Sequence, residues 1–372
     1  MAFSKTESLY ELLRIAVGAE DSVFNGGQKL TDEQWDLVHA EALRQLLAGV
    51  AYGAIAKLPQ AMRPSLDLIF QWASEAETVK GHNVLLNKEA ARLTQLFKEQ
   101  GAKSAVLKGP ANARLYPNPY ARQAGDIDIW VEGGKKAVME LLQKVGLEFD
   151  PNVQFSFHHI NLKNDRGVGV EVHFRPSSGN FNPFTRRRLL SFLEKEILKS
   201  ESTPEGFDVP TIRFALAMQL AHIQHHFLGT GVGLKQLLDF YMLLEHSSES
   251  DREFISSSLE KFGLRDFAGA LMWILGHIFE LDRAKMLCEP NEKYGVKILG
   301  DSVAGGNFGK HKKKFVGNFV QHWIRKKKRI FSLWGLAPAE IFWEEVDYWK
   351  MYIKSIPLRI RLRRVSIRDL FE

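Results

Sequence analysis

The hydrophobic spacing of the chain changes abruptly at Gly101. From residue 5 to about 100, apolar residues recur at steps of three and four, as in WDLVHAEALRQLLAGVAYGAIAKL, which predicts three or four helices. After Gly101, SAVLKG (104–109) is typical of a short strand that ends in glycine, PANARLY (110–116) of a helix, and DIDIWV (126–131) of a second strand. The chain must therefore build a sheet after its first hundred residues, and an all-helical fold is excluded.

Further β-rich and helical segments follow the strand at 126–131. Residues 135–146 are predicted to be helical, and FSFHHINLK and GVGVEVHFR form a hairpin joined by residues 164–167. Beyond the polar stretch SESTPEG, the spacing is helical again to about residue 288. These patterns predict an α+β fold with four parts, namely N-terminal helices (1–95), a small mixed-sheet core (96–204), a helical domain (205–300) and a basic C-terminal region (301–372).

The composition excludes several classes of protein. With 45% hydrophobic and 25% charged residues, the chain can bury a sizeable core and is not disordered. Its single cysteine, Cys288, excludes an internal disulfide and a multi-cysteine zinc site. The first residues lack the pattern of an export signal, and the longest apolar run, 268–281, is shorter than the ~20 residues that cross a bilayer. We therefore expect a cytoplasmic protein without a membrane span.

The positive charge of the chain is concentrated at its C-terminal end. Residues 310–372 hold 16 lysines and arginines against 6 acidic residues, a net charge of +10, which leaves −4 for the first 309 residues. This charge, in KHKKK and RKKKR, indicates either a solvated basic face, which we favour, or contact with nucleic acid or an acidic surface. Five aromatic residues of the same region are interpreted as a helix core: Phe342, Trp343, Tyr348, Trp349 and Tyr352.

Two aspartates on the DIDIWV strand are the first candidates for chemistry. Asp126 and Asp128 lie two residues apart, so their carboxylates project from the same face of the strand and can share a hard cation. Because the rest of the strand is apolar, two buried carboxylates would repel each other unless a metal ion or a proton neutralised one of them. The alternative is a solvated strand end with two aspartates of no special role.

Residues before and after this strand complete a candidate site. Gly109 lies where a strand gives way to a helix, a place that favours phosphate, and Lys108 adds a positive charge there. Glu171 is a third carboxylate within an apolar β segment, with His173 on the same face. The alternatives are an ordinary turn at Lys108 and a surface glutamate on a hairpin edge.

The order of these segments resembles that of a known family. The LKG turn, the helix with LYP, the arginine at 122, and the DIDIWV and EVHF strands resemble the uncharacterised bacterial nucleotidyltransferase family of the DNA polymerase β-like superfamily, over most of residues 5–250. In that superfamily a glycine turn opens a helix, an acid-x-acid strand follows, and a third acid lies on a later strand. The matching residues are Gly109, the pair Asp126 and Asp128, and Glu171.

The turn of this chain departs from the pattern of the superfamily. It reads Lys-Gly-Pro, whereas Gly-Ser or Gly-Gly is common there, and Pro110 has no N–H group to offer a phosphate. Lys108, Asn112 and Arg122 are expected to compensate. The residues predicted to bind the nucleotide are therefore Lys108, Gly109, Asn112 and Arg122.

The resemblance implies transfer of a nucleoside monophosphate from a nucleoside triphosphate to an acceptor, with release of pyrophosphate. Asp126 and Asp128 would bind Mg²⁺, or Mn²⁺ in its place, and Glu171 would bind a second metal ion or activate the acceptor, which is left open. One alternative is a metal-dependent glycosyltransferase that uses a nucleotide sugar, against which the helical sequence before Ser104 argues. Another is a non-catalytic binding protein with this fold, against which the three acids argue.

A histidine-rich helix follows the predicted core. His222, His225 and His226 are expected to be structural or to line the acceptor pocket rather than to hold zinc, because a two-histidine step offers only two ligands. His158 and His159 lie next to each other on a β segment, so one is expected to face inward and the other outward.

Overall fold

A computed structural model describes residues 3–18, 24–149, 157–163, 166–307 and 331–361, together with residues 321, 324, 327 and 328. Asn164 and Asp165 of the expected hairpin turn lie outside these residues, as do the basic run at 310–314 and most of the run at 325–329. The description below concerns the described residues.

Helices make up the first hundred residues, as predicted. They are α1 (Lys5–Val17), α2 (Asp32–Arg44), α3 (Ala48–Ile55) and α4 (Leu66–Glu99). Thr31 and Gln34 form the expected capping box at the start of α2, and Gly101, with a positive φ of 75°, follows the end of α4.

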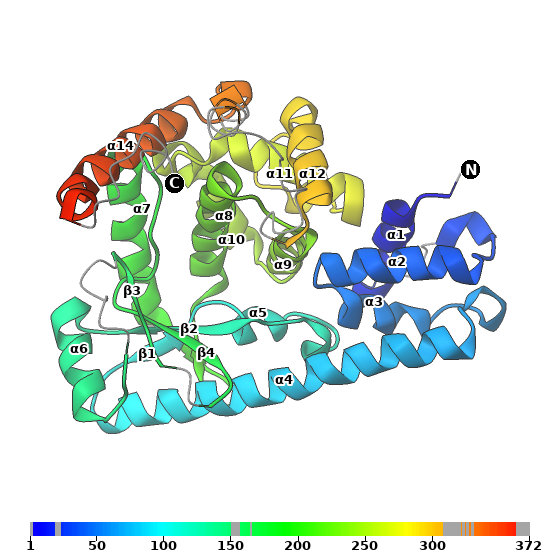
Figure 1. The fold of residues 1–372 in the computed structure, drawn as a ribbon, viewed down its shortest axis with the longest axis horizontal. Helices are drawn as coiled ribbons and strands as arrows, with labels where there is room; N and C mark the ends of the chain where they lie inside the picture. Colours follow the sequence, from blue (N-terminus) through cyan, green and yellow to red (C-terminus); the bar gives the residue numbers. More distant parts are fainter. Residues whose placement is uncertain are drawn as a thin grey trace.

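The long helix α4 joins two hydrophobic cores. Its 34 residues span about 50 Å and run from the N-terminal helices to the sheet (Figure 1). Leu68 and Trp72 near its start pack in the core of the helical part of the molecule, whereas Leu93 and Phe97 near its end pack with the sheet. The sheet is thereby held at a fixed distance from α1 to α3.

The central sheet has the strand order β1-β2-β4-β3, with β1 (Ser104–Val106), β2 (Asp126–Val131), β3 (His159–Asn161) and β4 (Gly169–His173). The pairs β1–β2 and β3–β4 are antiparallel, and β2–β4 is parallel, so the sheet is mixed, as predicted. In the β2–β4 register, Asp128 lies opposite Glu171. The third acid is therefore placed directly beside the aspartate pair.

Short elements surround the sheet. The helix expected after Lys108-Gly109 is α5 (Pro110–Ala113), with a 3-10 turn at Pro119–Ala121, and α6 (Gly134–Lys144) packs its Val138 and Leu142 against the sheet. The polar stretch at 200–206 contains part of an unexpected second sheet of two strands, β5 (Glu201–Ser202) and β6 (Asp208–Val209).

The remaining helices form the second half of the molecule. They are α7 (Pro183–Glu196), α8 (Ile212–Gly229), α9 (Leu234–Glu245), α10 (Glu249–Phe262), α11 (Arg265–Phe279), α12 (Glu292–Gly305) and α14 (Pro338–Arg361). The apolar run at 268–281 lies largely in the buried helix α11, as expected. Helices α4 and α12 each continue across an expected domain boundary, at residues 95 and 300. Among the described helices, none combines the length and apolar character that a membrane span requires.

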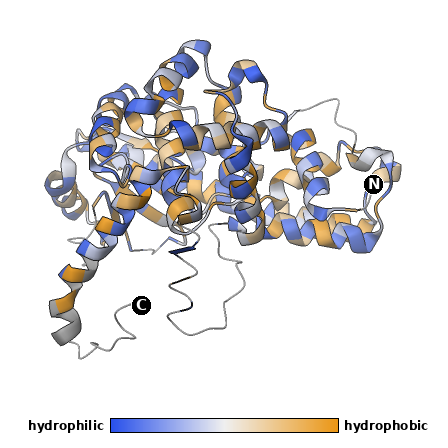
Figure 2. Cartoon of the chain, turned by 90° about the horizontal axis from the view of Figure 1, so that it is seen from above, coloured by the Kyte–Doolittle hydropathy of each residue, from blue (hydrophilic) through white to orange (hydrophobic). Residues whose placement is uncertain are grey.

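The expectation that the tail aromatics form a helix core is wrong for two of them. On α14, the side chains of Phe342 and Trp349 are exposed, with relative accessibilities of 53% and 44%. Figure 2 shows this helix projecting from the body, with hydrophobic and hydrophilic residues alternating along it. A projecting helix has too few neighbours to bury both of its faces.

Candidate active site

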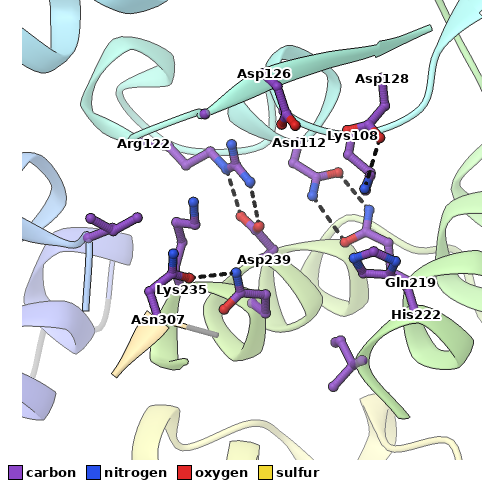
Figure 3. Close-up of a pocket in the computed structure, with 15 residues that line it drawn as sticks. Lys108, Asn112, Arg122, Asp126, Asp128, Gln219, His222, Lys235, Asp239 and Asn307 are labelled. Atoms are coloured by element: carbon purple, nitrogen blue, oxygen red, sulfur yellow. Dashed lines mark hydrogen bonds and ion pairs between the residues drawn. The ribbon is translucent and has the colours of Figure 1, made fainter. Parts of the chain in front are cut away.

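A polar cavity of about 370 Å³ lies where the sheet meets the helices α8 and α9 (Figure 3). One wall is the turn after β1 and the start of β2, and the opposite wall is formed by α8 and α9. Leu46 and Asn307 also contribute. Six of the seven predicted site residues line it, namely Lys108, Gly109, Asn112, Arg122, Asp126 and Asp128. Glu171 does not line the cavity, but lies beside Asp128 on β4.

The two aspartates of β2 have different surroundings. Asp126 is exposed, whereas Asp128 is buried, with a relative accessibility of 1%. Nζ of Lys108 and Nε2 of His173 each lie 3.0 Å from Oδ1 of Asp128. The expectation that both carboxylates are buried is therefore wrong, because only Asp128 is buried, where Lys108 and His173 contact it.

These contacts set the protonation of the pair. Burial acts to raise the pKa of Asp128, but Lys108 and then His173 lower it well below its usual range. For Asp126, restricted access of solvent and then the charge of Asp128 raise the pKa, which Lys108 only partly offsets. The exposed aspartate thus carries the uncompensated negative charge of the site, and a cation would relieve it.

Glu171 lies close to histidines of its own strand, β4, and of the neighbouring strand, β3. Its Oε2 lies 3.5 Å from Nε2 of His173 and 3.6 Å from Nδ1 of His159. The contact with His173 is the main reason that the pKa of Glu171 is lowered, against the effect of burial. Glu171 is therefore a carboxylate beside Asp128 with His173 on its face, as the sequence predicted, and it also contacts His159, which the sequence did not place there.

The glycine turn touches the aspartate strand directly. Gly109 has φ +61° and ψ −109°, and a Cβ atom at this position would lie 2.7 Å from the carbonyl oxygen of Asp126. The N–H group of Leu107 donates to the carbonyl of Asp128 at 2.8 Å, which ties the turn to β2. The following helix, expected over 110–116, ends at Ala113, so its dipole adds little to phosphate binding.

We predict that Gly109→Ala destabilises the folded protein by about 1–3 kcal/mol, because alanine is strained at this backbone conformation and its Cβ would press on β2. Gly125→Ala is the matched control, since Gly125 also lines the cavity and its Cβ would meet open space. Urea denaturation measures both. Equal stability of the two variants would contradict this account of Gly109.

Asn112 and Arg122 line the cavity, but their polar groups are engaged with the opposite wall. Nε and Nη2 of Arg122 donate to the two carboxylate oxygens of Asp239 at 2.8 and 2.6 Å. The side-chain amides of Asn112 and Gln219 donate to each other at 3.0 and 2.6 Å. These contacts fix α8 and α9 against the sheet. Both residues were expected to bind the nucleotide, and in the structure they shape the cavity.

Apart from His222, sequence reasoning missed the residues of the opposite wall. Lys235 is buried with a relative accessibility of 6%, and its Nζ donates to the carbonyl of Gln123 at 3.2 Å. Burial, and then the charge of Arg122, lower its pKa to about 8. Gln219 and Asp239 belong to the same wall. The sequence signal that could have indicated these residues is a polar residue within an otherwise apolar helical segment, such as LKQLLDFYMLL.

The histidines of α8 have the positions expected for structural or pocket-lining residues. His222 lines the cavity, and the ring of His225 stacks on Phe181 with centroids 4.2 Å apart. The rings of His222 and His226 are 4.3 Å apart. Burial lowers the pKa of all three, to about 4 for His226.

The fold and the site together define a class of protein. A small mixed sheet presents two acids on one strand and a third on its parallel neighbour, beside a glycine turn and a polar cavity, and this is the arrangement of a nucleotidyltransferase domain. The family of uncharacterised nucleotidyltransferases matches residues 31–280, and the chain belongs to this family. A comparison with curated proteins finds no match.

Proposed function

We propose that the protein transfers a nucleoside monophosphate from a magnesium-bound nucleoside triphosphate to an acceptor, with release of pyrophosphate. The observation that carries the proposal is the pairing of Asp128 with Glu171 across β2 and β4, with Asp126 exposed at the mouth of a cavity of about 370 Å³. The cavity lies in the size range of small-ligand sites. Membership of the nucleotidyltransferase family supports the same reaction.

Asp126 and Asp128 suit a hard cation such as Mg²⁺ through their carboxylate oxygens. The two contacts of Asp128 described above are made through Oδ1, so Oδ2 is the oxygen that would serve the ion. When bound, Mg²⁺ supplies charge stabilisation to the triphosphate. Lys108, held by Asp128 on one wall, and Lys235 on the other wall would attract its phosphates from two sides.

The test is a thermal-shift series followed by label transfer. Mg-ATP, Mg-GTP, Mg-CTP, Mg-UTP and UDP-sugars are added in turn, and a ligand at a hundred times its Kd should stabilise the protein by about 2.7 kcal/mol. We expect stabilisation by at least one triphosphate, and transfer of label from its α-phosphate to an acceptor in cell-extract fractions. Stabilisation by nucleotide sugars alone would support the glycosyltransferase alternative and overturn the proposal.

Nucleotide binding is expected to weaken as the pH rises from 7 to 9, because the pKa of Lys235 is about 8. Burial is the main reason that the pKa of Lys235 is lowered, and the charges of Arg122 and Lys108 lower it further. The charges of Asp239 and Asp126 raise it. The charged form attracts polyphosphate, so affinity is greatest below pH 8 and is lost as Lys235 gives up its proton.

Equilibrium binding of a Mg-triphosphate at several pH values measures this dependence. Lys235→Arg keeps its charge over the whole range and should give a flat profile, whereas Lys235→Met should bind weakly at every pH. A falling profile that persists in Lys235→Arg would assign the titration to another group.

A further inference from the structure

Three side chains on the adjacent strands β3 and β4 converge beside the aspartate pair. They are His159 on β3 and Glu171 and His173 on β4, and their Nδ1, Oε2 and Nε2 atoms all lie within 4.8 Å of one another. The side chains of His159 and Glu171 are 22% and 31% exposed, and that of His173 is 5% exposed. An ion could therefore reach the cluster from solvent while one ligand stays buried.

Two of the three separations between these atoms are those of ligands around one metal ion. With metal–ligand bonds of about 2.0–2.2 Å and tetrahedral angles, neighbouring ligand atoms lie roughly 3.3–3.6 Å apart. Oε2 of Glu171 lies 3.5 Å from Nε2 of His173 and 3.6 Å from Nδ1 of His159. A carboxylate oxygen equidistant from two imidazole nitrogens at this spacing can share an ion with both of them with little movement.

The strand pairing holds the cluster in place. His159 lies directly opposite His173 in the antiparallel β3–β4 register, and Glu171 is two residues before His173, on the same face of β4. All three ligands thus come from two hydrogen-bonded strands. Rigid placement of this kind reduces the conformational entropy that binding an ion would cost.

Existing contacts of the two ring nitrogens would change on binding. Nδ1 of His159 lies 3.0 Å from Nε2 of His158, and Nε2 of His173 lies 3.0 Å from Oδ1 of Asp128. A bound ion would be coordinated by Nδ1 of His159 and Nε2 of His173, so these nitrogens would lose their present contacts. The side chain of His158 would then move away from His159. Asp128 keeps its contact with Lys108, so the buried carboxylate would still be compensated.

We propose that His159, Glu171 and His173 form a site for a transition-metal ion of the zinc type, separate from the magnesium site at Asp126 and Asp128. Two imidazoles with one carboxylate favour Zn²⁺ and its first-row neighbours, whereas Mg²⁺ prefers oxygen ligands and keeps its waters. Three protein ligands leave an open position for water or a substrate atom.

The test measures metal binding by the full chain without nucleotide, so its result is independent of nucleotidyl transfer. Chelator-treated protein is titrated with Zn²⁺ by calorimetry and with Co²⁺ by visible absorption, in the presence of excess Mg²⁺. We expect one ion per chain, and a Co²⁺ spectrum of low coordination number. Absence of stoichiometric binding, or displacement by Mg²⁺, would overturn the proposal.

The ligands are tested with His159→Ala and Glu171→Gln, because both side chains are partly exposed and neither is the buried partner of Asp128. Each should weaken Zn²⁺ binding at least roughly 100-fold, since loss of even an indirect partner of a metal ligand costs 10–100-fold. The control is His246→Ala, an exposed histidine at the end of α9, which should bind Zn²⁺ like the wild type. Unchanged affinity in His159→Ala, or an equal loss in His246→Ala, would show that the ion binds elsewhere.

Discussion

Asp239→Asn is expected to destabilise the folded protein by about 3–5 kcal/mol, because it leaves the charge of Arg122 buried without a partner. The two residues are 4% and 5% exposed, and their side chains meet through two hydrogen bonds of 2.8 and 2.6 Å. The hydroxyl of Tyr116 also donates to Asp239 at 2.8 Å. Urea denaturation, followed by circular dichroism, gives the free energy of unfolding.

Two further variants separate this buried pair from an ordinary ion pair. In the double variant Arg122→Met with Asp239→Asn, the guanidinium is no longer buried without its carboxylate, and the new amide oxygen can still accept from Tyr116, so stability should exceed that of Asp239→Asn alone. The surface control is Glu77→Gln, since Glu77 and Lys80 are 70% and 53% exposed and contribute less than about 1 kcal/mol. A double variant that loses the sum of the two single effects would contradict the pairing argument.

The same pair predicts sensitivity to acid. Burial acts to raise the pKa of Asp239, but Arg122 lowers it below the usual value. A carboxylate whose pKa is depressed in the folded state contributes its stability above the unfolded pKa of about 4, and loses it as the pH falls through the folded pKa. The wild type should therefore lose stability below about pH 4 more steeply than the double variant.

Most of the fold could be predicted from local patterns in the sequence. Helical spacing predicted α2, α4, α6 and α11, and alternating apolar residues predicted β2, β4 and the β3–β4 hairpin, because these signals come from residues that are neighbours along the chain. The helix after Gly109 was predicted too long. Its pattern was compatible with a longer helix, but the backbone turns away after Ala113.

Apart from His222, the site could be predicted only on its sheet side. The aspartate pair, the glycine turn and Glu171 are marked by their spacing, whereas the opposite wall is joined to them by contacts between distant residues. Asn112 and Gln219 are 107 positions apart, and Arg122 and Asp239 are 117 apart. The compensation of Asp128 by His173, 45 positions away, could not be read from the apolar strand either.

This compensation changes the expected behaviour of the two aspartates. From the sequence, removal of either charge should leave the protein equally or more stable, because one of two like charges is lost. In the structure this holds only for Asp126, which is exposed and carries the uncompensated charge. Asp128 is the buried partner of Lys108 and His173, so asparagine at this position leaves the buried side of Lys108 and the ring of His173 without their carboxylate.

Asp126→Asn is therefore expected to be as stable as the wild type or more so, whereas Asp128→Asn should lose several kcal/mol. Both should lose the stabilisation by Mg-triphosphate and reduce turnover at least about 100-fold, since a bound metal ion supplies several kcal/mol of transition-state stabilisation. Thermal shift with and without the ligand, and denaturation without it, measure the two effects separately. Asp36→Asn, at an exposed position on α2, controls for the loss of one negative charge.

The contrast between the two aspartates distinguishes a metal site from a structural one. If Asp126 only caps the strand end, Asp126→Asn would keep its response to Mg-triphosphate, and the proposed magnesium site would be wrong. If Asp128 only holds Lys108 and His173, its variant would be unstable, yet would still respond to the ligand once folded at low temperature. Loss of the response in the stable Asp126 variant is the decisive result, because instability cannot explain it. A cation is then required at the charge that the protein itself leaves uncompensated.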